Sequence, residues 1–263
     1  MKDQYAGDIN DFHKYGLLRA LILPGGIRCG VWWMLTPDDG RSDGALVGYL
    51  ARPARYAVLD PELFGLMGTL VENGRRSVAA VEGSEILPGA AFDAAMVPVA
   101  AEARHCAFQK TLARFPDADL VFFDPDMGIE VPSIRHGSLR SRQYVYWSEI
   151  VETVDRDHSA LVFQYFPRRP RRDFIGHTLE EFACRVPTAS LSATWTPRVA
   201  FFLAATPAHA ALGSRLDSFS HSWGLPVMHR PAQTRQPSVE NSERRVAAVS
   251  LQPRALGDPA CTL

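Results

Sequence analysis

Acidic residues follow several apolar runs of the sequence at the points where these runs end. They form three groups, which are Asp38-Asp39-Gly40, Glu82 and Asp124-Pro125-Asp126. Carboxylates in such positions can orient an amine, accept hydrogen bonds from a ribose or bind Mg²⁺. The third group follows the most apolar run, so we expect the centre of a chemical site at Asp124.

Two chemical interpretations of these acids remain open. In the first, Glu82 accepts hydrogen bonds from a cofactor ribose while Asp124 and Pro125 hold an amine that is being methylated. In the second, carboxylates bind Mg²⁺ and polarise a phosphodiester, as in a nuclease or phosphohydrolase. The ligands would then be Asp38, Asp39, Asp124 and Asp126. The same aspartates could instead form turns between strand and helix. A catalytically inactive binding module of the same fold is a third possibility.

The elements that must position these acids alternate between strand-like and helix-like patterns. Short apolar runs predict buried strands at residues 29–35, 77–81, 120–123, 160–165 and 199–204. Helical spacing predicts a first helix over residues 8–23, with Asp8 as its cap, and further helices near 97–115, 142–155, 171–184 and 208–223. This alternation predicts an α/β fold of the Rossmann-like type, a doubly wound, mostly parallel sheet with helices on both faces.

The length and composition limit the classes of protein to consider. With 263 residues, 46% of them hydrophobic, the chain can form one domain over residues 1–229. Residues 230–263 are polar and rich in proline and are expected to form a tail, in which 246–251 could add an edge strand. No apolar run is long enough to span a membrane and the N-terminus lacks a signal-peptide pattern, so we expect a cytoplasmic protein. The pattern leaves the oligomeric state open.

Basic residues gather in two loops that follow the predicted strands. A formal net charge of −1 gives no overall positive field, so contact with nucleic acid must depend on local patches. Arginine binds phosphate through two parallel hydrogen bonds, which suits a polyanionic substrate. The residues expected to bind nucleic acid are Arg140, Arg142, Arg168, Arg169, Arg171 and Arg172.

Two motifs of the chain resemble those of a known enzyme family. Residues 7–15 and 120–127 are similar to the J-type large-subunit ribosomal-RNA adenine-N6 methyltransferases, and more distantly to the three-Cys-motif partner proteins. Gly7, Asp11 and Lys14 match the N-terminal motif of the methyltransferases. Asp124-Pro125 stands where that family has its Asp-Pro-Pro-Tyr motif, at the end of a hydrophobic strand.

This resemblance implies a class I methyltransferase-like fold and methylation of an amino group of a nucleic acid, with S-adenosylmethionine as the donor. It implies a catalytic group made of Asp124, Pro125, Asp126 and Lys14, and a cofactor site made of Asp11, Asp38, Asp39, Gly40 and Glu82. The active-site motif is degenerate, because Asp126 and Met127 replace the second proline and the tyrosine. A second carboxylate at this point also suits Mg²⁺, the alternative cofactor.

Overall fold

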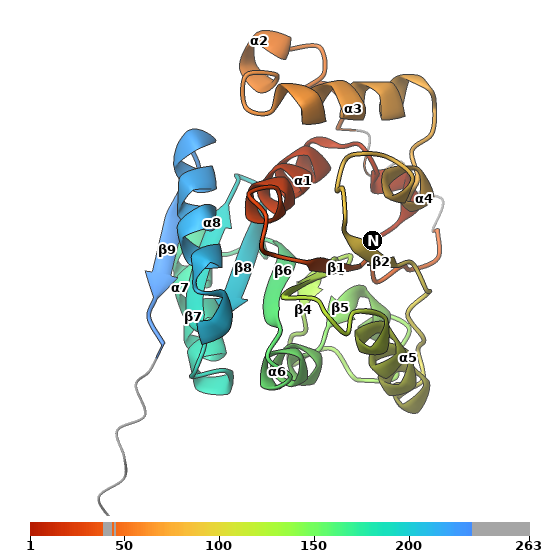
Figure 1. Cartoon of the computed structure of the whole chain (residues 1–263). Helices are drawn as coiled ribbons and strands as arrows, with labels where there is room; N and C mark the ends of the chain where they lie inside the picture. Colours follow the sequence, from red (N-terminus) through yellow and green to blue (C-terminus); the bar gives the residue numbers. More distant parts are fainter. Residues whose placement is uncertain (39–43, 45, 233–263) are drawn as a thin grey trace, which may run out of the picture. The chain divides into compact units, whose positions relative to one another are not determined.

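A mixed seven-stranded sheet with helices on both faces forms the centre of the fold (Figure 1). The computed structural model describes residues 1–38, 44 and 46–232. The predicted edge strand at 246–251 and the predicted site residues Asp39 and Gly40 lie outside these residues. None of the helices in the described ranges is both long and apolar enough to cross a membrane.

The strands of the large sheet follow the order β2-β1-β3-β6-β8-β7-β9. Their bounds are β1 Cys29–Trp32, β2 Ala91–Asp93, β3 Leu120–Phe123, β6 Ser159–Tyr165, β7 Ser190–Trp195, β8 Val199–Ala205 and β9 Val227–Arg230. The first four in spatial order run parallel, and Trp32 pairs with Phe123 at the carboxyl ends of β1 and β3. The remaining pairings are antiparallel. A separate pair joins β4 (Gly128–Ile129) to β5 (Tyr144–Val145).

Helices cover both faces of this sheet (Figure 1). One face packs against α1 (Ile9–Ile22), α4 (Val78–Glu82) and α8 (Ala211–Ser222). Helix α3 (Pro61–Glu72) packs on the outer side of α1, with the short α2 (Pro53–Tyr56) beside α3 (Figure 1). The other face packs against α5 (Ala101–Arg114), α6 (Trp147–Asp155) and α7 (Arg171–Arg185). Short 3₁₀ turns occur at Asp3–Tyr5, Ser141–Gln143 and Pro207–His209. Helices on both faces of the sheet confirm the α/β class that the sequence predicted.

The alternation of side chains along the strands explains why both faces need cover. Successive strand residues point to opposite faces, so Phe122 packs toward α1 while Phe123 packs toward α5 and α6. Trp33 and Trp32 divide in the same way. A strand that buries both faces reads as a continuous apolar run, which is why β1, β3, β6 and β8 were recognisable in the sequence.

Two sequence predictions about the sheet were wrong. Residues 77–81 were expected to form the second strand, but Ser77 caps α4, where its hydroxyl accepts a hydrogen bond from the backbone of Ala80. The second strand is β2, which is only three residues long. Residues 199–204 were expected to extend a mostly parallel sheet, but β8 runs antiparallel between β6 and β7. The apolar run of β8 identified a buried strand but carried no information on its direction.

Candidate functional site

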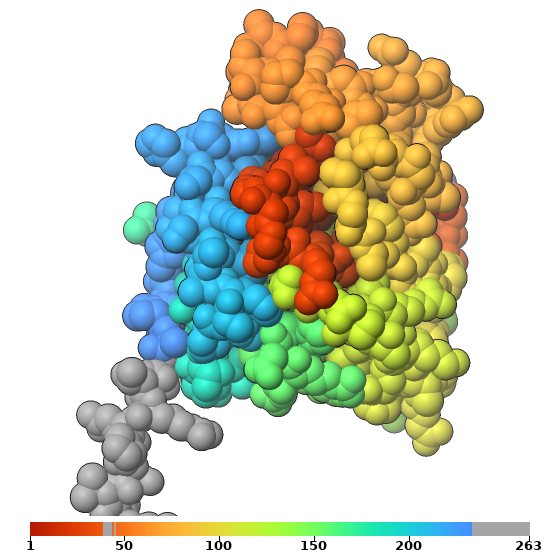
Figure 2. Space-filling model, in the orientation of Figure 1, coloured from red at the N-terminus to blue at the C-terminus, as the bar shows by residue number. Residues whose placement is uncertain are grey.

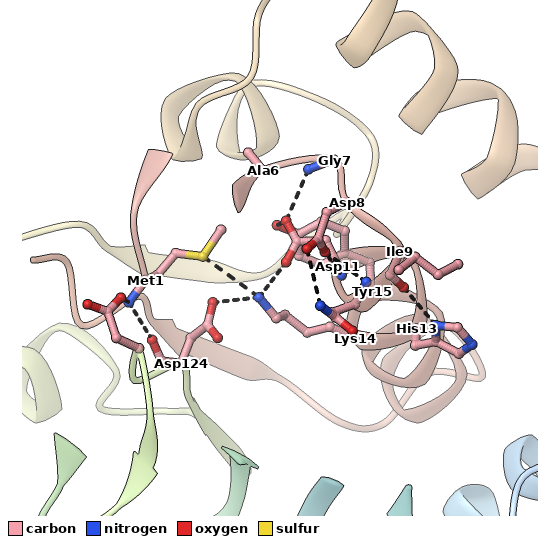
Figure 3. Close-up of polar contacts among 12 residues, drawn as sticks. Met1, Ala6, Gly7, Asp8, Ile9, Asp11, His13, Lys14, Tyr15 and Asp124 are labelled. Atoms are coloured by element: carbon pink, nitrogen blue, oxygen red, sulfur yellow. Dashed lines mark hydrogen bonds and ion pairs between the residues drawn. The ribbon is translucent and has the colours of Figure 1, made fainter. Parts of the chain in front are cut away.

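The parallel half of the sheet has a topological switch point beside β1. The next strand along the chain, β2, lies on one side of β1, and β3 lies on the other. Crossover connections diverge at such a point and leave a crevice at the carboxyl ends of the two strands. Asp124 follows β3 directly at this edge, and α1 places Asp11 and Lys14 over it (Figure 3).

A buried ion-pair network joins α1 to the end of β3. The ammonium of Lys14 lies 2.6 Å from Oδ1 of Asp11 and 2.8 Å from Oδ2 of Asp124 (Figure 3). The backbone amide of Gly7 and the hydroxyl of Tyr15 donate to the other oxygen of Asp11, at 3.1 and 3.2 Å. All three charged side chains are at most 2% exposed. The structure therefore brings together Asp11, Lys14 and Asp124, three of the predicted site residues.

Burial and charge act in opposite directions on this network. Burial disfavours the charged form of Lys14, but attraction from Asp11 and Asp124 outweighs it and raises the pKa of the lysine. Burial also raises the pKa of Asp124, and the neighbouring ammonium of Lys14 opposes that rise. Lys14 is consequently a permanent cation at neutral pH.

Asp126 lies beside this network and has its own partners. Its carboxylate is 2.9 Å from the α-amino group of Met1 and accepts a hydrogen bond from the hydroxyl of Thr36. The same α-amino group donates to the backbone carbonyls of Asp124 and Met34, at 2.9 and 3.1 Å. These contacts tie the first residue, the loop after β1 and the loop after β3 to one point.

Asp8 is a residue of the site whose chemistry the sequence did not reveal. As the cap of α1, it accepts hydrogen bonds from the backbone amides of Asn10 and Asp11 at 2.7 and 2.9 Å. Burial, with the negative charge of Asp11 as a second cause, raises its pKa to about 7. Its capping role follows from the sequence pattern, but its raised pKa depends on its burial in the folded protein and, secondly, on the charge of Asp11.

Glu82 lies away from this centre, which corrects the reason for its selection. It ends α4 rather than a strand, and its carboxylate accepts a hydrogen bond of 2.8 Å from the indole of Trp33. The acid that ends the second strand is Asp93, which accepts hydrogen bonds from Thr111 and Arg114. Asp93 is thus occupied within the fold, and no strand-end position supports the ribose role assigned to Glu82.

A cleft of about 840 Å³ adjoins the network and carries most of one basic loop. Its lining includes Asp8, Asp126, Arg168, Arg169 and Arg171. The inner space that touches Lys14 and Asp124 is only about 10 Å³, the size of a single water molecule. Of the other predicted nucleic-acid residues, Arg140 and Arg172 are exposed and Arg142 is half-buried, and none of the three is among those that line this cleft.

The two carboxylates after β3 each have an ammonium partner. Asp124 pairs with Lys14, and Asp126 pairs with the α-amino group of Met1. Within the described ranges, no group of three or more histidine, cysteine, aspartate or glutamate side chains is placed to hold a metal ion. Asp38 is exposed in the loop after β1.

No protein-family model matches this chain, and none of the curated proteins matches it. The residues of the cleft and their contacts are therefore the basis for assigning a function.

Proposed function

We propose that this protein is a methyltransferase-like enzyme that transfers a methyl group from S-adenosylmethionine to an amino group of a nucleic acid. The observation that carries the proposal is the position of the Asp11–Lys14–Asp124 network. It lies at the switch point of a Rossmann-like sheet, against a cleft lined by Arg168, Arg169 and Arg171. A cofactor site and a phosphate-binding surface thereby meet at one edge of the sheet.

The residues of the site divide into a supporting group and a group that faces the cleft. Lys14 holds Asp11 and Asp124 together and so fixes the loop after β3 against the start of α1. Asp126 and Asp8 face the cleft. Pro125 lies between Asp124 and Asp126 and restricts the backbone of this loop.

The chemistry needs a base for one proton. When the bond between the methyl carbon and the donor sulfur breaks, the amine nitrogen forms the new bond to carbon and loses a proton. Asp8 suits this role because its pKa of about 7 leaves a substantial fraction of the side chain ionised at neutral pH. The carboxylate of Asp126 would accept a hydrogen bond from the same amine.

The cleft fits a nucleoside cofactor better than the inner space does. A volume of about 10 Å³ beside Lys14 is too small for S-adenosylmethionine, whereas a cleft of about 840 Å³ is in the range of ligand pockets. Asn10 offers an amide oxygen for a ribose hydroxyl of the cofactor. Tyr165 and Phe166 offer aromatic surface for an adenine ring. The cofactor role of Asp38 stays a proposal, and Asp39 and Gly40 lie outside the described residues.

The magnesium-dependent alternative is less favoured by the contacts. Mg²⁺ bound by Asp124 would have to displace the ammonium of Lys14, which lies 2.8 Å from that carboxylate. The displaced ammonium would remain buried beside a divalent cation, and like charges in a buried site repel strongly.

The experiment is a calorimetric titration with S-adenosylmethionine, followed by transfer of a radiolabelled methyl group to single-stranded RNA and DNA oligonucleotides. We expect the wild-type protein to bind the cofactor and to label an oligonucleotide. Asp126→Asn should lower the turnover at least ~10-fold, because it removes a negative charge beside the reacting amine. Asp117→Asn is the matched control, since Asp117 is an exposed acid before β3 and should leave turnover unchanged.

Two results would overturn the proposal. The first is a wild-type protein that neither binds the cofactor nor transfers the methyl group, which would favour the binding module. The second is cleavage of the oligonucleotide that requires Mg²⁺ and proceeds without S-adenosylmethionine, which would favour the nuclease.

A further inference from the structure

A second cleft, of about 630 Å³, continues from the first around the start of α1. Both clefts are lined by Asn10, Leu46, Pro197 and Arg198, so they meet along a common wall. The second cleft lies where α2, the start of α1 and the segment after α8 come together. In Figure 2 these parts are the orange, red and blue segments that meet on the face shown.

The charges along the two clefts are almost entirely positive. Six arginines line them, namely Arg52, Arg55, Arg168, Arg169, Arg171 and Arg198. All six are exposed, and no ion pair joins any of them to a carboxylate of the described residues. The acidic residues that line the clefts are Asp8 and Asp126, both buried. The chain has a net charge of −1, but these six arginines, which have no carboxylate partner among the described residues, give the two adjoining clefts a positive potential that would attract a polyanion.

The aromatic side chains of the clefts indicate what kind of polyanion would fit. Tyr56 and Trp223 are half-buried in the wall of the second cleft, and Tyr165 and Phe166 are half-buried in the wall of the first. Aromatic surface beside a row of positive charges is typical of proteins that bind single strands, because unpaired bases can stack on it. The bases of a duplex are already stacked on one another and cannot use such a surface.

The charges in a neighbouring third cleft indicate in which direction the row of arginines continues from the first cleft. A third cleft, of about 840 Å³, lies beyond Met127 and Phe166 and also contains acidic residues. There Glu181 pairs with Arg185 at 3.0 Å, and Glu130 pairs with His136. Arg169 lines both the first and the third cleft, whereas the other five arginines line the first and second clefts only, so most of the unpaired positive charge extends from the first cleft into the second.

We propose that one strand of single-stranded nucleic acid lies along the first and second clefts, with its phosphates on the six arginines and with Arg198 at the junction. The target nucleotide would lie in the first cleft, beside Asp126 and Asp8. Arg52 and Arg55 would bind the phosphates of the nucleotides that flank it. We call this arrangement the strand path. It depends on the proposed function in one respect only, which is the identity of the target nucleotide.

The experiment measures fluorescence anisotropy of a labelled 12-nucleotide single strand of mixed sequence, over a series of salt concentrations and without S-adenosylmethionine. Each phosphate contact to a single strand contributes roughly 0.7 to the slope of log K against log salt concentration. Six contacts therefore predict a slope of about −4 for the wild-type protein. Replacing Arg52 and Arg55 by alanine should make the slope less steep by about 1.4.

The matched control replaces two exposed arginines outside both clefts, Arg75→Ala and Arg135→Ala, and should leave the slope unchanged. An unchanged slope in the Arg52→Ala, Arg55→Ala variant would overturn the strand path. Equal affinity for a duplex of the same sequence would overturn the assignment to single strands. A protein that binds the strand as expected but does not bind S-adenosylmethionine would contradict the proposed function and leave the strand path standing.

Discussion

At the scale of single residues, the site is a cluster of buried charges that stabilise one another. Lys14 is the side-chain cation between Asp11 and Asp124, and Asp8 lies close enough for its pKa to respond to Asp11. A buried ion pair contributes little net stability compared with a well-packed apolar core, but removal of one partner leaves an uncompensated charge. A substitution in this cluster should therefore change both the chemistry of the site and the stability of the fold.

Replacement of Lys14 by methionine should strongly destabilise the protein. The change keeps much of the side-chain volume but leaves the carboxylates of Asp11 and Asp124 buried beside each other, at a cost of about 3–5 kcal/mol. Urea denaturation followed by far-ultraviolet circular dichroism would measure the free energy of unfolding. The control is Lys110→Met, an exposed lysine on α5, which should change it by less than about 0.5 kcal/mol. A loss below about 1 kcal/mol for Lys14→Met would mean that the network is not ionised as we describe.

Replacement of Asp8 by asparagine should change how stability depends on pH. The folded-state pKa of Asp8 is raised from 3.8 to about 7, so between these values the folded protein holds a proton that the unfolded chain has lost. Asp8 thus makes the wild-type protein less stable as pH rises from about 4 to about 7. Asparagine can still cap the helix, but its side chain does not ionise and therefore binds no proton in this pH range.

The free energy of unfolding of Asp8→Asn relative to wild type should therefore increase across that window, by at most about 1.4 kcal/mol per pH unit. Above pH 8 the two stability curves should run parallel, which gives an internal control. Denaturation at several pH values would measure both curves. A constant difference from pH 4 to pH 9 would show that Asp8 has an ordinary pKa in the folded protein.

At the scale of elements, α1 must be held closely in place, because it carries Asp8, Asp11 and Lys14. Gly16 lies on the side of α1 that faces Trp223, at the end of α8. A Cβ atom at Gly16 would come within 2.3 Å of the indole ring, so only glycine allows this approach. The packing of α8 against α1 therefore depends on the absence of a side chain at one position.

Gly16→Ala should destabilise the protein by about 1–3 kcal/mol, because the free-energy cost of the clash with Trp223 is larger than the free energy gained from the higher helix propensity of alanine. The matched control is Gly65→Ala on α3, where a Cβ atom would meet nothing within 4 Å. At this exposed helical position alanine should stabilise the protein by about 0.5–1 kcal/mol. Thermal unfolding would measure both changes, and we expect opposite signs. A stabilising effect of Gly16→Ala would show that Trp223 can move away without cost.

At the scale of the whole molecule, the central strands should be the most stable part of the described region. Strands β3, β6 and β8 each have hydrogen-bonded neighbours on both sides and are almost completely buried. Helix α2 has no buried residues. We expect hydrogen exchange monitored by mass spectrometry to show the slowest exchange in the three strands and fast exchange in α2. Equally slow exchange in α2 would indicate that this helix is packed more firmly than its exposure suggests.

Several features of the protein could be read from the sequence because they depend on neighbouring residues. A strand buried on both faces needs an unbroken apolar run, and residues 120–123 and 160–163 have one. The cap of α1 needs an acid directly before a helical pattern, which identifies Asp8. The grouping of Asp124 with Asp11 and Lys14 came only from the resemblance to a methyltransferase family, because no local pattern brings a helix start to a strand end.

Other features were decided only by the tertiary structure. The pattern of residues 77–81 suits a strand and a short helix equally, and packing of Val78 and Val81 against the core settled it as α4. The direction of β8 depends on its partners, β6 and β7, which no local pattern encodes. The raised pKa of Asp8 and the row of arginines from Arg168 to Arg52 arise between segments far apart in the chain. Local sequence determines which elements can form, whereas burial and long-range charge, which require the folded chain, determine what those elements bring together.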